Sequence, residues 1–230
     1  SDVCRGLWRR LGWQDYGGSC GGVVMANPNA QRGKALRLDG IRRLLALLPD
    51  RVGLVDEAYV DFGAQSAAAR VRDYPNLLVV QTFSKSRALA GLRVGFAFGQ
   101  PDLIEGLTRV KDSFNSYPLD RLAQAGALAS VEDEAWFASA VAAVVQTRGV
   151  LAQGLEGLGF TVLPSEANFV YTQHPGYDAA ELAAQLRARA IIVRHLKGER
   201  TAQWLRITVG TDAQCAALLS ALRDILHRVS

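Results

Sequence analysis

Cysteine and histidine are both scarce in this chain, which has three of each among its 230 residues. Cys4, Cys20 and Cys215 form no C-x-x-C pair, and an odd, dispersed set indicates a reducing compartment without a disulfide framework. The histidines lie far apart and none belongs to an H-E-x-x-H sequence, so we predict no metal site.

Continuous apolar stretches are short, and none approaches the roughly 20 residues that a membrane-spanning helix needs. Residues 1–22 lack the apolar centre of a signal peptide. With 49% hydrophobic and 21% charged residues, the composition is that of an ordinary globular protein and argues against general disorder. We therefore expect a cytoplasmic protein without a membrane segment.

The positive charge is spread thinly, since 26 Lys and Arg against 22 Asp and Glu leave a formal net charge of +4. Nucleic-acid-binding domains gather their basic residues in patches. Only Arg5, Arg9 and Arg10, beside Trp8 and Trp13, form such a group here. A solvated basic surface explains them, and we expect no nucleic-acid partner; a nucleic-acid-binding protein, whose affinity would fall steeply with salt, is the alternative.

Apolar runs and amphipathic segments alternate from residue 23 onward. In the first half, strands are expected at residues 23–26, 52–55, 77–80 and 94–98, and helices at 38–48 and 101–111. In the second half, strands are expected at 160–163, 168–171, 191–194 and 204–209, and helices at 120–131, 134–155, 178–188 and 212–226.

These patterns predict an α/β fold in two parts. Continuous apolar strands joined by helices are typical of a mostly parallel sheet covered on both faces, and such sheets bind ligands beyond the carboxyl ends of their strands. The second half groups its strands and helices in α+β fashion. We assign residues 23–125 to the first domain and 126–230 to a connecting helix and a small C-terminal domain, and leave 1–22 unassigned.

Lys85 is the principal candidate for chemistry because it follows a predicted buried strand and lies between Ser84 and Ser86. A lysine in that place can form a Schiff base when its amine is made nucleophilic by desolvation or a neighbouring cation. A surface lysine in a loop is the competing interpretation. A Ser-Lys hydrolase is disfavoured because the S-x-x-K spacing is absent.

Other polar residues accompany Lys85 at predicted strand ends. Asp56 ends a predicted strand and can pair with a protonated ring nitrogen of a cofactor, or it can simply cap a helix. Tyr59 follows three residues later. Ser84 and Arg93 offer a hydroxyl and a guanidinium, which are the components of a phosphate site; a surface ion pair is the competing role for Arg93.

Together these positions closely resemble the core of the fold-type I aminotransferases, which use pyridoxal phosphate (PLP). The resemblance covers about residues 23–226. Within that family, the chain resembles in detail the histidinol-phosphate aminotransferases of histidine biosynthesis. The motifs that carry it are Asp56-Glu57-Ala58-Tyr59, Thr82-Phe83-Ser84-Lys85-Ser86, Ala90-Gly91-Leu92-Arg93-Val94-Gly95, Phe114-Asn115-Ser116-Tyr117-Pro118-Leu119, Ala167-Asn168-Phe169-Val170 and Leu205-Arg206-Ile207-Thr208-Val209-Gly210.

The resemblance implies a PLP-dependent transferase large domain, incomplete at its N-terminal side, followed by a small α+β domain. It makes Lys85 the Schiff-base lysine and proton shuttle, and it pairs Asp56 with the pyridine nitrogen. It places Tyr59 at the ring's phenolic oxygen, with Ser84 and Arg93 at the cofactor phosphate.

For the substrate, the resemblance implies that Arg206 binds the α-carboxylate and that Asn168 orients the substrate. Tyr117 would line the pocket and Arg194 would meet a substrate phosphate; ordinary strand-end roles compete for Asn168 and Arg194. The implied reaction moves an amino group between L-histidinol phosphate and 2-oxoglutarate in a homodimer. A related PLP enzyme such as threonine-phosphate decarboxylase, or a non-catalytic truncated remnant, is the alternative.

Two departures from the family pattern stand out. The family usually carries Asn-Pro-Asn-Ala-Pro-Thr-Gly or a close variant, whereas Gln31 and Arg32 replace the Pro-Thr pair here. Asn29 is our candidate for the cofactor's ring oxygen, and Asn27 is the second choice. The match also begins inside the family's sequence. We therefore expect this chain to lack the N-terminal third of the family's sequence and to have an incomplete cofactor pocket.

Overall fold

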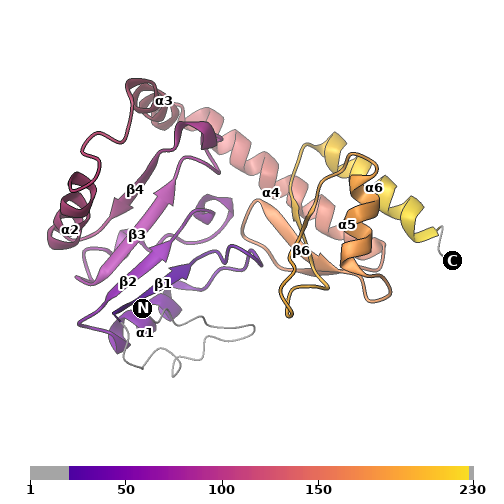
Figure 1. Ribbon diagram of the computed structural model, residues 1–230, viewed down its shortest axis with the longest axis horizontal. Helices are drawn as coiled ribbons and strands as arrows, with labels where there is room; N and C mark the ends of the chain where they lie inside the picture. The colour runs from indigo at the N-terminus through magenta and orange to yellow at the C-terminus, as the bar shows by residue number, and fades with distance from the viewer. Residues whose placement is uncertain (1–20, 228–230) are drawn as a thin grey trace. The chain divides into compact units, whose positions relative to one another are not determined.

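The computed structural model describes residues 21–227, which fall into two compact units (Figure 1). Unit 1 runs to Pro28 and includes Ala35–Val60 and Ala64–Glu134. Unit 2 comprises Asn29–Lys34, Asp61–Gly63 and the chain from Ala135 onward. The arginine and tryptophan group near the N-terminus, together with Cys4 and Cys20, lies outside the described residues.

Unit 1 contains a four-stranded sheet in the order β1-β2-β3-β4. Its strands are β1 (Gly22–Ala26), β2 (Val52–Asp56), β3 (Leu77–Thr82) and β4 (Gly95–Phe98). The first three are parallel and β4 is antiparallel to β3. The predicted α/β fold with a largely parallel sheet is confirmed. The antiparallel strand follows from its connection, since residues 83–94 hold a single 3-10 turn and no crossover helix.

Helices α1 (Leu38–Leu47), α2 (Pro101–Asp112) and α3 (Arg121–Glu132) belong to unit 1, as do the short 3-10 helices η3 (Ala68–Arg70) and η4 (Ala90–Leu92). Helix α1 carries apolar residues at helical spacing and buries Ile41, Leu44 and Leu45. Ile41 and Leu45 pack with Val55, Leu77 and Val79, which are almost fully buried. This core holds β2 and β3 side by side, and with them the polar residues at their ends.

Unit 2 is an antiparallel sheet with helices. Its elements are α4 (Glu134–Gly157), β5 (Thr161–Leu163), β6 (Phe169–Gln173), α5 (Ala179–Arg187), β7 (Arg194–His195), β8 (Leu205–Thr208) and α6 (Asp212–His227), with strand order β5-β6-β8-β7. The turn η2 (Val60–Phe62) lies at the boundary of the units. Val170, Leu205 and Ile207 on one face of the sheet share a core with Leu151 of α4 and Leu222 of α6.

The predicted strand at residues 191–194 is wrong for most of its length. Ala190 adopts a left-handed conformation with φ 60°, and the N–H of Ile191 donates to the carbonyl of Leu186, which closes the end of α5. Only Arg194 and His195 pair with β8. Ile191 and Val193 pack against the core without joining the sheet, so apolar character there reports burial and not strand pairing.

Helix α4 has the length and composition of a membrane-spanning helix, with a mean hydropathy of 1.3, although little of it is buried. Gln146, Thr147 and Arg148 interrupt the apolar residues of the helix, so it contains no continuous apolar stretch of about 20 residues, and length and composition alone are weak evidence for a membrane span. Arg148 is a residue of this helix, and its guanidinium donates to the carbonyls of Phe62 at 2.9 Å and Ala167 at 2.7 Å. Burial lowers the pKa of Arg148. The carboxyl-terminal half of α4 places Leu151 and Leu155 in the core of unit 2.

Candidate active site

The predicted cofactor residues of unit 1 gather where parallel strands end. Asp56 is the last residue of β2 and pairs in register with Ala26 of β1 and Val80 of β3. The backbone continues the ladder beyond it, since the N–H of Asn27 donates to the carbonyl of Asp56 at 2.8 Å. Lys85 follows the end of β3 by three residues. Parallel strands end at one edge of the sheet, which brings residues 29 apart in sequence to the same place.

Lys85 has an exposed side chain on a fixed backbone. Its Nζ atom lies 5.5 Å from the centre of the Tyr59 ring. The preceding turn is held by Thr82, whose Oγ1 accepts from the N–H of Ser84 at 3.1 Å and donates to Ser84 Oγ at 2.9 Å. A surface lysine would be equally exposed; the aromatic ring and the strand-end neighbours distinguish this one.

Asp56 presents one carboxylate oxygen to the protein and keeps the other free within the described residues. Its Oδ1 accepts from the N–H of Ala58 at 3.0 Å, and its Oδ2 has no hydrogen-bond partner among residues 21–227. A carboxylate held in this way can accept a hydrogen bond from a protonated ring nitrogen.

The neighbouring carboxylate of Glu57 has a role that sequence reasoning missed. It is 1% exposed and accepts hydrogen bonds from Ser66 Oγ at 2.6 Å, the N–H of Ala67 at 2.6 Å and Gln81 Nε2 at 2.8 Å. Burial of a carboxylate requires such partners. Glu57 therefore ties the turn after Asp56 to β3. The only signal of this role in the sequence is the position of an acidic residue directly after a predicted buried strand.

The remaining two candidates of unit 1 are exposed. Arg93 adopts a left-handed conformation with φ 57°, and its Nη1 donates to the carbonyl of Ala90 at 2.8 Å. Tyr117 lies between α2 and α3, and its side chain is 92% exposed. The structure thus brings Asp56, Tyr59 and Lys85 together with the Ser84 turn, and it leaves Tyr117 outside that group.

The departure from the family pattern has a structural consequence in the loop of residues 29–34. Asn29 Oδ1 accepts from the N–H groups of Gln31 at 3.1 Å and Arg32 at 3.0 Å. A proline at position 31 has no N–H and could not make the first of these bonds. The loop of this chain therefore contains a hydrogen bond that the usual Pro-Thr pair excludes.

The two asparagine candidates, Asn27 and Asn29, differ in their hydrogen-bond partners. Asn27 is 1% exposed and uses both ends of its amide on Leu36, donating from Nδ2 to the carbonyl at 3.2 Å and accepting from the N–H at 2.6 Å. Asn29 uses its amide oxygen in the turn, while its Nδ2 has no partner among residues 21–227. Asn29 is therefore the asparagine whose donor is available for a ligand.

Three of the predicted substrate residues, Arg206, Arg194 and Asn168, lie in unit 2, as does this loop, whereas Tyr117 lies in unit 1. Arg206 of β8 donates from Nη1 to the carbonyl of Ala30 at 2.8 Å, and its guanidinium lies 4.8 Å from the centre of the Phe169 ring. Arg194 is exposed and faces Arg206 in register across β7 and β8. Asn168 precedes β6, and its carbonyl accepts from the N–H of Val209 at 2.9 Å. Arg206 thus contacts the loop directly, and Arg194 is its neighbour on the adjacent strand.

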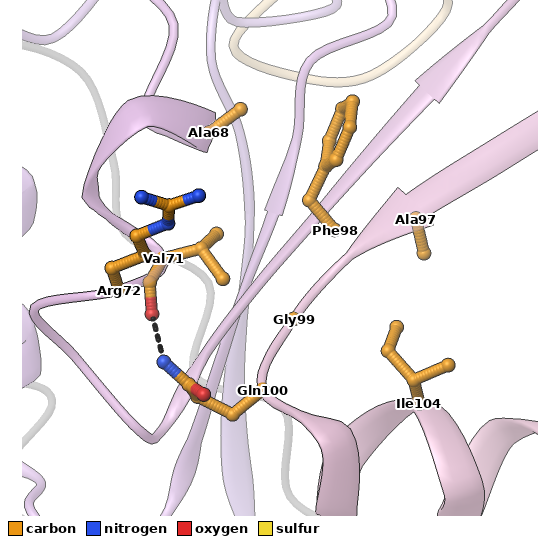
Figure 2. Close-up of a pocket in the computed structure, with 8 residues that line it drawn as sticks. All are labelled: Ala68, Val71, Arg72, Ala97, Phe98, Gly99, Gln100 and Ile104. Atoms are coloured by element: carbon orange, nitrogen blue, oxygen red, sulfur yellow. Dashed lines mark hydrogen bonds between the residues drawn. The ribbon is translucent and has the colours of Figure 1, made fainter.

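A separate cavity of about 440 Å³ lies in unit 1 and is lined by none of the predicted site residues (Figure 2). Its walls come from the turn after η3, the end of β4 and the start of α2. Gln100 crosses it and donates from Nε2 to the carbonyl of Val71 at 2.9 Å. The lining residues are Ala68, Val71, Arg72, Ala97, Phe98, Gly99, Gln100 and Ile104.

Comparison with known proteins identifies the family of this chain. The model of the family "aminotransferase class I and II" matches residues 7–222. Histidinol-phosphate aminotransferase from Acetobacter pasteurianus is 74% identical over 212 residues, which are 92% of this chain and 60% of the relative. This chain thus spans about 60% of the length of the curated relatives that it matches.

Solved structures show the same fold. Histidinol-phosphate aminotransferase from Sinorhizobium meliloti, in complex with pyridoxal-5'-phosphate, superposes with a TM-score of 0.82 at 24% identity, covering 91% of this chain and 58% of that one. L-threonine-O-3-phosphate decarboxylase from Porphyromonas gingivalis gives a TM-score of 0.77 at 25% identity, with 89% and 64% covered. The fold is thus common to both chemistries, whereas the high sequence identity is to the aminotransferase.

Proposed function

This chain belongs to the aminotransferase class I and II family, and on that premise we propose that it is the larger part of a PLP-dependent histidinol-phosphate aminotransferase. The reaction transfers an amino group from L-histidinol phosphate to 2-oxoglutarate. The observation that carries the proposal is the meeting of Asp56, Tyr59 and Lys85 at the carboxyl edge of β2 and β3. Identity of 74% to an enzyme of that name supports the choice of substrate.

The residues of unit 1 suit the cofactor. PLP, when bound, supplies an electron sink that stabilises negative charge at the substrate carbon. Asp56 Oδ2 is available to hold a proton on the ring nitrogen, and the Tyr59 phenol can donate to the ring oxygen. Ser84 and Arg93 supply a hydroxyl and a guanidinium for the phosphate. Lys85 binds the cofactor through Nζ and then carries the proton at the substrate carbon as general base and acid.

The residues of unit 2 suit the substrates. Arg206 is held by the Ala30 carbonyl and the Phe169 ring, so it presents its guanidinium in a fixed place for a carboxylate. Asn29 offers an amide donor to a ligand, and Asn168 orients the substrate. Arg194 supplies positive charge for a substrate phosphate. Tyr117 belongs to unit 1, and its place in the substrate pocket rests on the family resemblance alone.

A test of the cofactor site is the absorbance spectrum of the purified chain with added PLP, beside Lys85→Ala. A band at ~420 nm in the parent alone indicates a lysine-bound cofactor. Borohydride reduction followed by peptide mass analysis should place the adduct on Lys85. A parent chain without the band, or an adduct spread over several lysines, would support the non-catalytic alternative.

Substrate specificity requires a second assay. Chain that shows the band is given L-histidinol phosphate with 2-oxoglutarate, and glutamate is measured. O-phospho-L-threonine is the comparison, because release of CO₂ from it would identify the decarboxylase. Glutamate formation that depends on L-histidinol phosphate, without CO₂ release, is the expected result.

The proposal includes a homodimer in the bacterial cytoplasm. Unit 1 exposes large apolar side chains on and between α2 and α3, including Phe114 and Leu122, each 80% exposed. Exposed apolar side chains that lie close together favour association. Sedimentation velocity over a range of concentrations should show a dimer, and a monomer at all concentrations would contradict this part of the proposal.

A further inference from the structure

Tyr171 has a buried hydroxyl without a partner. It lies in β6, is 0% exposed, and its ring stacks on Trp204 with centroids 4.8 Å apart and planes 8° apart. Its Oη atom has no hydrogen-bond partner among residues 21–227. A hydroxyl that leaves water without a partner costs free energy, so such a group in a folded protein needs an explanation.

A second orphaned donor lies on the neighbouring strand. Arg206 is the register partner of Tyr171 across β6 and β8, so their side chains share one face of the sheet as direct neighbours. The Nε atom of Arg206 is buried and has no partner among the described residues, while Nη1 is occupied by the Ala30 carbonyl. Two donors on adjacent residues thus lack an acceptor.

The charge around these donors favours an anion. Arg194 stands opposite Arg206 in register, and neither forms an ion pair with a carboxylate in the part of the chain that the structure describes. Like charges in this arrangement repel each other unless an anion lies between them. Burial raises the pKa of Tyr171 to about 12, although the positive charge of Arg32 acts to lower it. The phenol therefore keeps its proton at neutral pH.

We propose that Tyr171 is a substrate-positioning residue whose hydroxyl, together with Nε–H of Arg206, donates to one anionic group of the substrate. The ligand is a carboxylate or a phosphate monoester, both of which offer several acceptor oxygens. This inference rests on the proposed function, since that reaction uses an oxo acid and a phosphate ester. It assigns Tyr171 a role that none of the sequence motifs indicated.

The test uses two tyrosines of unit 2 that differ in their hydroxyl partners. Tyr171→Phe keeps the stack on Trp204 and removes only the orphaned hydroxyl. Tyr177→Phe is the matched control, because Tyr177 Oη donates to the carbonyl of Leu226 at 2.8 Å. Binding of 2-oxoglutarate and of L-histidinol phosphate, each alone, is measured by calorimetry on the 230-residue chain, and the melting temperature is measured without ligand.

We expect Tyr171→Phe to weaken binding of one of the two anions by about tenfold or more, as for the loss of a hydrogen bond to a charged group. Its melting temperature should be unchanged or higher, since an unsatisfied buried hydroxyl is removed. Tyr177→Phe should lower the melting temperature and leave both affinities unchanged. The anion whose affinity falls identifies the group, carboxylate or phosphate, that Tyr171 contacts.

Three results would overturn the inference: equal affinity of Tyr171→Phe and the parent for both anions, a loss of melting temperature like that of Tyr177→Phe, or no anion binding by the parent. The ~420 nm band tests the proposed function separately, through Lys85 in unit 1. A band and turnover with unaltered Tyr171→Phe would refute this inference alone. Anion binding that depends on Tyr171 without a band would refute the proposed function alone.

Discussion

Gly33 is the residue on which the loop beside Arg206 depends. It has φ +76°, its N–H donates to the carbonyl of Asn29 at 2.8 Å, and its own carbonyl accepts from the N–H of Glu166 at 2.7 Å. A Cβ atom here would lie 2.2 Å from Ser165 Oγ and 3.3 Å from a ring carbon of Phe169. Only glycine combines this conformation with this close approach.

Gly33→Ala should lower the free energy of unfolding by about 2–4 kcal/mol, from left-handed strain together with overpacking against Ser165. Gly149→Ala is the control, because Gly149 is exposed in α4 and a Cβ there meets nothing within 4 Å. That substitution should raise stability by about 0.5–1 kcal/mol. Urea unfolding of both variants is the measurement, and equal stabilities would contradict the account of the loop.

Tyr171 should also make the stability of the chain fall at alkaline pH. Its pKa is raised to about 12 in the folded chain, so folding favours the protonated phenol. That stabilisation is complete below the unfolded pKa of about 10 and is lost as the pH rises towards 12, by about 3 kcal/mol in all. Unfolding free energies measured from pH 9 upward should fall more steeply for the parent than for Tyr171→Phe, and parallel curves would contradict the burial of the phenol.

Among the elements, the end of α1 depends on a single amide. Asn76 lies just before β3 and donates from Nδ2 to the carbonyls of Leu48 at 2.8 Å and Arg51 at 3.1 Å. Leu48 caps the end of α1 and its carbonyl also accepts from the N–H of Arg51 at 3.1 Å, so the amide adds a second donor there and ties the following turn to it. The same side chain therefore fixes α1 relative to β2 and β3, which carry Asp56 and Lys85 at their far ends.

Asn76→Ala should lower the free energy of unfolding by about 1–3 kcal/mol, because the hydrogen bonds of the Nδ2 group to Leu48 and Arg51 are lost. Asn76→Asp should cost at least as much, since a carboxylate cannot donate to them. Asn115→Ala is the control, because its side chain is exposed and accepts from only the N–H of Tyr117. Chemical denaturation distinguishes the three, and an Asn76→Asp variant as stable as the parent would disprove the role of the amide.

Each unit has a main core of its own, and a smaller cluster of Phe83, Val94 and Ala123 lies in unit 1. Leu77 is fully buried with Ile41, Leu45 and Val79 in unit 1, and Leu222 is fully buried with Leu151 and Leu155 in unit 2. Each core includes residues of its own unit and has its own sheet. Separate cores allow sub-global opening with different free energies.

Leu222→Ala should lower the stability of unit 2 by about 2–5 kcal/mol through the cavity that it leaves, and Leu77→Ala should do the same to unit 1. Hydrogen exchange followed by mass spectrometry measures the two units separately. We expect Leu222→Ala to speed exchange in β6 and β8 while β2 and β3 keep their protection, and the reverse for Leu77→Ala. Equal loss in all four strands for either variant would show a single cooperative unit.

Most elements could be predicted from the sequence because their signals are local. The apolar run at residues 77–80 predicted β3, and the helical spacing of Ile41, Leu44 and Leu45 predicted α1. Lys85 and Asp56 could be selected because a strand end is visible in sequence as the point where an apolar run meets polar residues. The site residues proposed on this basis remain predictions until the variants are made.

Other features were decided by tertiary structure alone. Nothing in the sequence near Tyr171 indicates that its hydroxyl is buried without a partner, because that depends on pairing with Arg206, 35 positions later. The contact of Arg206 with Ala30 joins residues 176 apart, and the direction of β4 and the choice between Asn27 and Asn29 also depend on distant partners. Periodicity reports which residues are buried, whereas register and hydrogen-bond partners are set only when segments far apart in the chain come together.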